Sequence, residues 1–277
     1  MKYNFPLFRQ RCELPLESFA HLGRLTTAPN GRHIFIERGA QILAVAHMDS
    51  VSAPSHFAVD EATGIVFAPT LDDRLGAHII LDILPTMGVC ADILLTENEE
   101  ACHSTAADFT LPPGKRYNWV FSFDRAGSDV VTYRYDSRGW KKSLRRAGWK
   151  IGMGSYSCIA ELDQLGVCAA NFGAAYHDHH TPGAYCSLHE LGANLVRFCA
   201  FYAQNKDKKF TYKSRADSYR QLCRYDYSRD NELQYDPQYP CTWCGMVYGR
   251  DELERDCTGY VCVNCAVDLK NLKYHPS

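Results

Sequence analysis

The feature that most constrains this chain is the alternation of short apolar runs with segments of helical periodicity. The runs 41–46 and 119–123 are continuous, apolar and too short for an amphipathic helix, which predicts buried strands. Segments 74–84 and 189–204 repeat apolar residues at helical spacing, which predicts helices. Because strands that alternate with helices are typical of α/β domains, we expect a mostly parallel central sheet flanked by helices.

Further elements continue this alternation, and each is predicted from local signals. Pro85 cannot donate a backbone hydrogen bond, so we expect the helix of 74–84 to stop there. The turn at 62–64 predicts a β-hairpin. The hairpin strands are expected at 57–59 and 65–68, further strands at 91–96, 130–135 and 167–176, and further helices at 137–147 and 158–165.

Composition excludes several function classes. The chain has 277 residues, 46% of them hydrophobic, which is enough to build a large core. The net charge of −2 argues against a general binder of nucleic acid or of membrane surfaces. No apolar run reaches the ~20 residues of a membrane helix, and residues 1–10 lack the apolar stretch of a secretory signal. We therefore expect a soluble, cytoplasmic protein that binds neither membranes nor nucleic acid.

The chain is expected to divide into three parts. Residues 1–204 would form the α/β domain. Residues 205–235 carry eight Lys or Arg and five Asp or Glu with few aliphatic side chains, which indicates a linker or a solvated helix. Residues 236–277 would form a small C-terminal module.

Polar side chains follow five consecutive predicted elements where each one ends. In open α/β sheets, ligands bind beyond the carboxyl ends of the strands. Side chains from all five elements are therefore expected to meet at one rim of the sheet. The five segments are 47–49 (His-Met-Asp), 70–74 (Thr-Leu-Asp-Asp-Arg), 97–100 (Glu-Asn-Glu-Glu), 124–125 (Asp-Arg) and 177–181 (His-Asp-His-His-Thr).

This set of side chains suits a pair of zinc ions. Zinc binds histidine nitrogen and carboxylate oxygen, and a catalytic site leaves one position open for water. Two ions ~4 Å apart can hold a bridging water and the substrate carbonyl together. Three ligand carboxylates and one hydroxide would balance the charge of the two ions.

The order of these motifs resembles that of the co-catalytic dizinc aminopeptidases, the bacterial leucyl and glutamyl aminopeptidases among them. The resemblance covers residues 40–204 and implies a zinc-peptidase-like fold. Its motifs are His47-x-Asp49, Leu71-Asp72-Asp73-Arg74-x-Gly76, Glu99-Glu100, Asp124-Arg125-x-Gly127 and His180-Thr181-Pro182.

The resemblance also implies roles for single residues. Asp72 would bridge two zinc ions, and Glu99 would be the general base that takes a proton from water. Asp49 would orient the ring of His47. The remaining ligands would be His47 and Asp124 at one ion, and Glu100 and His180 at the other.

Each of these residues also has a purely structural interpretation. Asp73 is typical of a helix N-cap. Glu97, Glu99 and Glu100 could form a solvated turn. His177 and His179 are alternatives to His180 as the ligand.

Two departures from the family bear on assembly and on substrate recognition. The interval from His47 to Asp72 is 25 residues, which leaves room for a hairpin only. The lid or barrel domain that many relatives insert there, and through which some build large shells, is therefore not expected. The loop 154–158 carries Cys158 where compact relatives have an acidic residue, so recognition of the substrate amine stays open.

The C-terminal cysteines have the spacing of a structural zinc site. Cys241-x-x-Cys244 and Cys262-x-x-Cys265 are separated by seventeen residues. Two such pairs at this distance predict a closed zinc ribbon with four cysteine ligands and no catalytic chemistry. Acidic residues outnumber basic ones over 236–277, so a protein partner is favoured over nucleic acid.

Together these observations predict a zinc metallopeptidase with two catalytic zinc ions and one structural zinc ion. Cobalt or manganese would also fit the catalytic pair. The expected activity is that of an aminopeptidase on peptide or aminoacyl substrates. The alternatives are a deacylase or carboxypeptidase that acts on N-acyl amino acids, and a non-catalytic metal-binding protein that uses the ribbon for interaction. The oligomeric state stays open.

Overall fold

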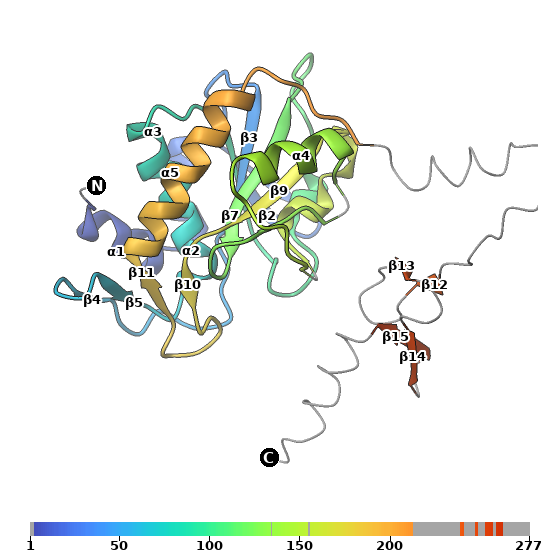
Figure 1. The fold of residues 1–277 in the computed structure, drawn as a ribbon. Helices are drawn as coiled ribbons and strands as arrows, with labels where there is room; N and C mark the ends of the chain where they lie inside the picture. The colour runs from blue at the N-terminus through green and yellow to red at the C-terminus, as the bar shows by residue number, and fades with distance from the viewer. Residues whose placement is uncertain are drawn as a thin grey trace, which may run out of the picture. The chain divides into compact units, whose positions relative to one another are not determined.

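The computed structural model describes residues 3–133, 135–154 and 156–212, and four short strands between residues 239 and 262. The chain divides into two compact units, residues 1–219 and 220–277. Figure 1 shows the helices and strands of the first unit, which carries the candidate site. Among the residues that the structure describes, no helix combines the length and the apolar character needed to cross a bilayer.

The first unit contains one larger and one smaller β-sheet together with α-helices and short helical turns. The larger sheet consists of β1 (Arg24–Ala28), β2 (Gly31–Ile36), β3 (Ile42–His47), β6 (Asp92–Thr96), β7 (Trp119–Arg125), β8 (Val130–Val131) and β9 (Ala169–Gly173). The smaller sheet consists of β4 (Ala58–Asp60), β5 (Ile65–Phe67), β10 (Tyr176–His177) and β11 (Tyr185–Ser187). The α-helices are α1 (Phe5–Glu13), α2 (Leu71–His78), α3 (Leu84–Thr86), α4 (Arg138–Arg146) and α5 (Leu188–Asn205). A π turn (Ile79–Ile83) joins α2 to α3, and 3₁₀ turns span Leu16–Leu22, Thr105–Asp108, Cys158–Glu161 and Asp163–Leu165.

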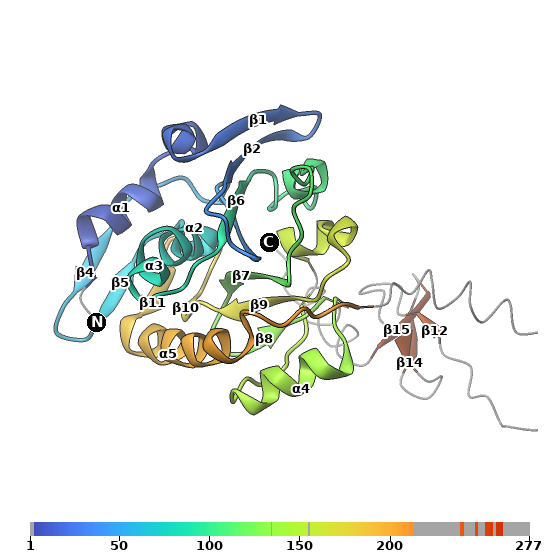
Figure 2. The ribbon, with the colours of Figure 1, turned by 90° about the horizontal axis from the view of Figure 1, so that it is seen from above.

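The larger sheet has the strand order β1-β2-β6-β3-β7-β9-β8. Its four central strands β6, β3, β7 and β9 run parallel. The hairpin of β1 and β2 adds antiparallel strands at one edge, and β8 closes the other edge. Figure 2 shows the succession from β1, β2 and β6 at one edge to β7, β9 and β8 at the other. The expected α/β class with a mostly parallel central sheet is confirmed.

The central strands β3, β6 and β9 are buried on both faces. Because successive side chains of a strand point to opposite faces, their residues divide between two cores. In β3, Ile42, Ala44 and Ala46 belong to the core beneath the α-helices, whereas Leu43 and Val45 belong to a second core. The second core is closed by residues of the 3₁₀ turns, such as Ala106 and Ile159, and by Phe109, which follows the first of these turns. The helices therefore cover one face, and short turns cover the other (Figure 2).

Four local predictions differ from the structure. Segment 158–165 is not one helix but two 3₁₀ turns, because it lies across the second core at the sheet and ends at left-handed Gly166. Pro85 does not end the helical run at residue 84: α3 follows the π turn directly and extends to Thr86. The strand expected at 130–135 is limited to β8. The strand expected at 167–176 breaks between β9 and β10, where Ala175 has φ +61°.

In the second unit the structure describes strands β12 (Tyr239–Pro240), β13 (Val247–Tyr248), β14 (Leu253–Asp256) and β15 (Gly259–Cys262), paired as two antiparallel hairpins. Cys262 ends β15, and the predicted ligands Cys241, Cys244 and Cys265 lie outside the described residues. Most of the predicted 205–235 linker also lies outside them. The zinc ribbon and this linker stay predictions.

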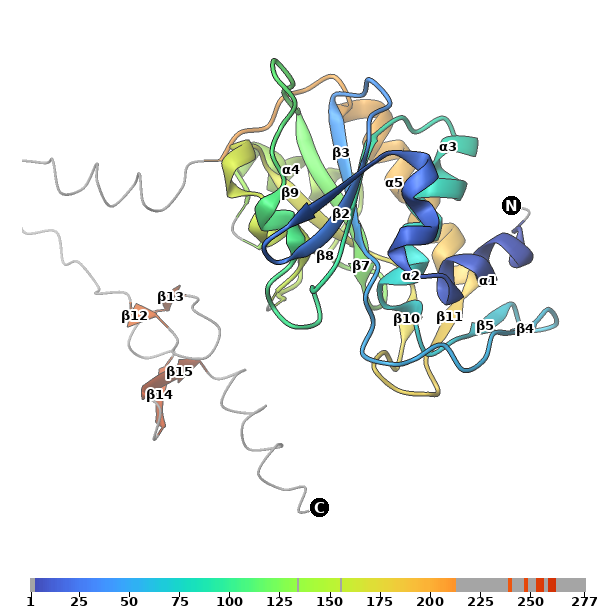
Figure 3. The ribbon, with the colours of Figure 1, turned by 180° about the vertical axis from the view of Figure 1, so that it is seen from behind.

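Helix α1 is fastened to α2 and the following π turn by a buried ion pair. Arg11 donates two hydrogen bonds of 2.8 Å to the two carboxylate oxygens of Asp82. The Nδ1 atom of His78 lies 2.9 Å from the same carboxylate, and the His78 ring stacks on Phe8. Figure 3 shows α1 beside α2. Burial alone would raise the pKa of Asp82, but the hydrogen bonds from Arg11 and His78 outweigh it and lower the pKa.

Asp82→Asn should therefore destabilise the first unit. We expect a loss of about 2–4 kcal/mol in the free energy of unfolding at pH 7, because Arg11 keeps its buried charge without a partner. The pKa of Asp82 is lowered on folding, so its stabilisation is present above the unfolded pKa of about 4 and lost as the pH falls through the folded pKa. Urea unfolding of the wild type and the variant at pH 7 and pH 3 measures both effects. Glu61→Gln, in an exposed turn, is the control, and an equal loss in both variants would contradict the assignment.

Candidate metal centre

The predicted site residues lie at the carboxyl ends of three adjacent parallel strands. His47 ends β3, Glu99 and Glu100 follow β6, and Asp124 lies near the end of β7. Since β6, β3 and β7 are neighbours in the sheet, the three strand ends meet at one rim. Asp72 reaches this rim from the start of α2.

His47 is the buried centre of the first group of side chains. Its Nε2 atom lies 3.4 Å from Asp72 Oδ1, 3.5 Å from Asp124 Oδ1 and 3.7 Å from Glu99 Oε2. This atom is buried and has no hydrogen-bond partner among the described residues. The other ring nitrogen, Nδ1, lies 3.1 Å from the backbone oxygen of Asp49 and 3.4 Å from its Oδ1. The ring therefore presents Nε2 to three carboxylates.

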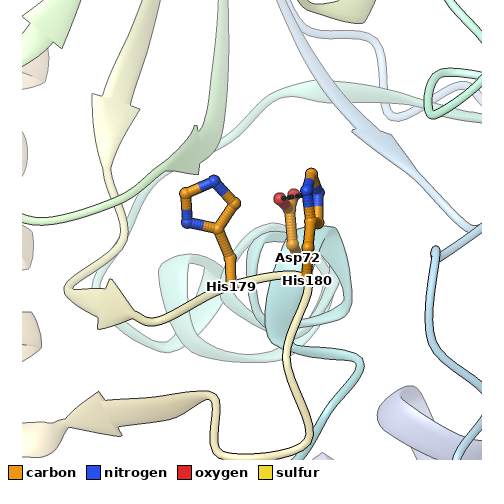
Figure 4. Close-up of side chains that lie close together, drawn as sticks. All are labelled: Asp72, His179 and His180. Atoms are coloured by element: carbon orange, nitrogen blue, oxygen red, sulfur yellow. Dashed lines mark ion pairs between the residues drawn. The ribbon is translucent and has the colours of Figure 1, made fainter. Parts of the chain in front are cut away.

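A second group of side chains forms on the opposite side of Asp72. His180 Nε2 lies 3.1 Å from Asp72 Oδ2 and 3.1 Å from Glu100 Oε2. His179, His180 and Asp72 offer ligand atoms within 4.8 Å of one another, as do His47, Asp72 and Asp124. Figure 4 shows the first of these sets, with Asp72 close to His180 and the ring of His179 at the side. Asp72 thus belongs to both groups and turns one oxygen to each.

The backbone around Asp72 lets its carboxylate leave the helix. Asp72 and Asp73 have non-helical dihedral angles although they stand at the start of α2. Asp73 is not a solvated N-cap: it is fully buried, and its Oδ2 accepts the backbone N–H of His47. A Cβ atom at position 76 would lie 1.9 Å from Asp73 Oδ1, so only glycine fits beneath this carboxylate. The motif residues Asp73 and Gly76 therefore hold α2 against the end of β3.

Glu99 and Glu100 diverge from a tight turn. Asn98 takes a left-handed conformation with φ +64°, which asparagine tolerates better than most residues. Glu99 points to His47, whereas Glu100 points to His180. The Glu100 backbone N–H donates to Asp49 Oδ2 at 3.0 Å. Asp49 therefore contacts both the His47 ring and the turn that carries the two glutamates.

Asp124 is held by residues that sequence reasoning missed. Asn171 on β9 accepts the Asp124 backbone N–H at 2.8 Å and donates to the Asp124 backbone oxygen at 2.8 Å. Ser157 donates to Asp124 Oδ2 at 3.0 Å. The available signal was Asn171 itself, a polar residue inside an otherwise apolar strand.

Cys158 does not line the cavity that is lined by Asp72, Asp124, Glu99 and Glu100. Its buried thiol lies 3.1 Å from Thr96 Oγ1 and 3.2 Å from Ser104 Oγ, so it belongs to the second core behind the strand ends. The loop before it contributes Ser157 to the site instead.

Of the three neighbouring histidines, the structure brings two to Asp72. His177 turns away, and its Nε2 lies 2.8 Å from Glu190 on α5. His180 makes the shortest approach to Asp72, and His179 lies within reach of both.

The concentration of carboxylates shifts their pKa values. Burial and the charges of Asp124, Asp72 and Glu100 raise the pKa of Glu99 to about 8. Burial and the charge of Asp72 raise the pKa of Asp124 to about 7. Burial opposes the charged form of Asp72, but the neighbouring rings of His180 and His47 outweigh it and lower the pKa of Asp72. Burial opposes the charged form of His47, but the surrounding carboxylates raise its pKa well above the usual value.

These residues fit a pair of divalent cations. Histidine nitrogen and carboxylate oxygen are zinc ligands, and each of the two groups supplies one histidine and one carboxylate in addition to Asp72. A cation would satisfy the buried His47 Nε2 atom, which faces three carboxylates without a hydrogen bond. It would also relieve the repulsion that raises the pKa of Glu99 and Asp124.

Comparisons with known proteins bear on the fold. No protein-family model matches the chain, and its sequence matches no curated protein. A tripeptidase from Staphylococcus aureus is similar in structure, with a TM-score of 0.50 and 10% identity over 71% of this chain and 95% of that one. An aminopeptidase PepT from Bacillus cereus has a TM-score of 0.48 and 10% identity over 71% and 95% of the two chains. A TET aminopeptidase from a Thaumarchaeota archaeon has a TM-score of 0.49 and 10% identity over 73% and 96%. At this identity the likeness to the tripeptidase shows a shared fold.

The two groups predict a definite metal stoichiometry. Zinc-reconstituted protein should contain about three zinc ions per chain, one at the cysteines and two that mild chelation removes. Asp72→Asn should lose both removable ions because its carboxylate faces both histidines, whereas His180→Ala should lose one. Metal analysis after gel filtration measures this, with His56→Ala on an exposed loop as the control. A count near one in the wild type would contradict the dinuclear site.

The raised pKa values predict that metal binding releases protons. Without metal, His47 and Glu99 hold protons at pH 7, because the pKa of His47 is raised well above its usual value and that of Glu99 is raised to about 8. His47 must lose its proton to act as a ligand, and the charge of bound cations would lower the pKa of the neighbouring Glu99, so zinc affinity should increase as the pH rises from 6 to 8. Calorimetric titration in buffers of different ionisation enthalpy measures the protons released. Zinc binding at pH 6.5 without proton release would contradict these protonation states.

Proposed function

We propose that this protein is a dizinc hydrolase that cleaves amide bonds and acts as an aminopeptidase on peptides. The observation that carries the proposal is Asp72, whose Oδ1 faces His47 at 3.4 Å and whose Oδ2 faces His180 at 3.1 Å. A carboxylate with one oxygen toward each of two separate ligand groups is the arrangement that a bridging ligand requires. The resemblance of the motifs to the co-catalytic dizinc aminopeptidases supports the same assignment.

In this proposal each metal has three protein ligands and keeps a position for water and substrate. Asp72 bridges the two sites. His47 and Asp124 complete one site, and Glu100 and His180 complete the other. When bound, two divalent cations lower the pKa of a water molecule and polarise the carbonyl of the substrate. Zinc is the proposed metal, and cobalt or manganese would fit the same ligands.

Glu99 is the proposed general base. It lies at the rim with Oε2 3.7 Å from His47 Nε2, yet it belongs to neither ligand set. Its carboxylate can accept the proton of the attacking water and pass it to the nitrogen of the leaving amine. Burial raises the pKa of this carboxylate, and a raised pKa helps a base to return the proton that it has accepted.

Asp49 is the proposed positioning residue. Its backbone and side-chain oxygens contact the His47 ring, and its carboxylate accepts the Glu100 backbone N–H. One residue thereby orients a ligand of each site. Carboxylates that orient metal-bound histidines in this way also make the ring a stronger ligand.

Glu99→Gln should keep both metals and lose activity. We expect the turnover of glycyl-leucine by zinc-loaded protein to fall by at least ~100-fold, because glutamine cannot accept the proton. Metal analysis should give the wild-type zinc content, since Glu99 is not a ligand. Glu61→Gln, on an exposed turn, should keep wild-type turnover. Turnover within a few fold of the wild type in Glu99→Gln would show that another group is the base.

A further inference from the structure

The wall of the candidate cavity is asymmetric in charge. Its lining carboxylates are Asp72, Glu99, Glu100 and Asp124, all of which the proposed function assigns to metal binding or to proton transfer. The remaining described lining residues include Arg125, His179 and His180 but no further carboxylate. Two divalent cations balance the four carboxylates. No uncommitted carboxylate is then left on the described wall to attract an ammonium group, whereas one guanidinium group is present.

A backbone irregularity explains why Arg125 faces the cavity. Adjacent residues of a regular strand point to opposite sides, so Asp124 and Arg125 should not share a surface. The pairing of β7 with β9 shifts register between Ser122 and Arg125. Such bulges turn side chains to new directions next to binding sites. Both Asp124 and Arg125 accordingly line the same cavity.

Arg125 is held in place at one edge of its guanidinium group. Its Nε and Nη2 atoms donate to the two oxygens of Asp129 at 2.7 and 2.9 Å. A Cβ atom at Gly152 would lie 1.9 Å from Asp129 Oδ2, so the glycine lets the backbone pack closely against this pair. Guanidinium has five N–H donors in a planar fork, and no described residue accepts from Nη1. The pair with Asp129 fixes Arg125 while donors stay available to a ligand.

The cavity is small for a peptide-binding groove. Its volume is about 270 Å³, just below the range of about 300–1,000 Å³ of typical ligand pockets. A short substrate that places its own terminal charge inside the cavity suits this volume better than a long chain.

We propose that Arg125 binds the α-carboxylate of the amino acid released by cleavage. The inference rests on the proposed function and narrows its substrates to amides whose leaving amine carries a free carboxylate. Dipeptides and N-acyl amino acids share this chemistry. Arg125 then determines specificity through the leaving side of the scissile bond, and Asp129 positions it.

Three substrates test the proposal with zinc-loaded protein: glycyl-leucine, glycyl-leucinamide and N-acetyl-leucine. We expect wild-type kcat/KM to be ~10–100-fold higher for glycyl-leucine than for its amide, the scale of a lost charged hydrogen bond. Arg125→Gln should bring this ratio to within about threefold of one, mainly through KM, because a neutral amide cannot replace the paired charges. Asp129→Asn should lower the ratio by less. Arg146→Gln, exposed on α4, should keep the wild-type ratio.

A binding measurement separates this proposal from the proposed function. Calorimetry with leucine and leucinamide should give a preference for leucine in the wild type that Arg125→Gln loses, whether or not any substrate is cleaved. If none of the three substrates is cleaved but the preference for leucine holds, the proposed function is overturned and the role of Arg125 stands. A ratio near one in the wild type, or a wild-type ratio in Arg125→Gln, would overturn the role of Arg125. Preference for N-acetyl-leucine over glycyl-leucine, with the dependence on Arg125 intact, would support the role and identify N-acyl amino acids as the source of the carboxylate.

Discussion

Asp72 lies between two histidines, and the other candidate ligands are arranged around its charged carboxylate. Its two oxygens face His47 and His180, while Asp124, Glu99 and Glu100 approach the same rings. Burial, together with repulsion from the neighbouring carboxylates, raises the pKa values of Glu99 and Asp124. The two divalent cations of the proposed function would remove that repulsion.

The fold brings these carboxylates and histidines together at the ends of its strands. Three neighbouring parallel strands end together, and each carries a functional side chain at or just past its end. Hydrogen-bonding partners then fix the direction of each side chain: half-buried Asp49 for His47 and Glu100, and buried Asn171 and Ser157 for Asp124. A site built on strand ends and supported by a second layer of hydrogen bonds is more rigid than one built on long loops alone.

The spacing of apolar residues predicted the central strands and the long helices, because an element that is buried against the core needs apolar side chains at regular positions. It failed where tertiary contacts outweigh local preference. Segment 158–165 was predicted as one helix but forms two 3₁₀ turns, with Ile159 and Leu162 packed into the second core. The residues that support Asp124 were missed for a similar reason: Asn171 and Ser157 lie far from it in sequence, and their roles exist only after the strands pair.

The sequence by itself determined the α/β class and the order of the polar residues that follow successive strands, since both follow from the local pattern of apolar and polar residues. Only the tertiary structure decided which side chains meet. It turned His177 toward Glu190 and His180 toward Asp72, and it buried Asp73 and Cys158 behind the rim. A shift of register in β7 brought Arg125 into the cavity beside Asp124. The physical reason is that the direction of a side chain depends on strand pairing and packing, which join residues distant in the chain.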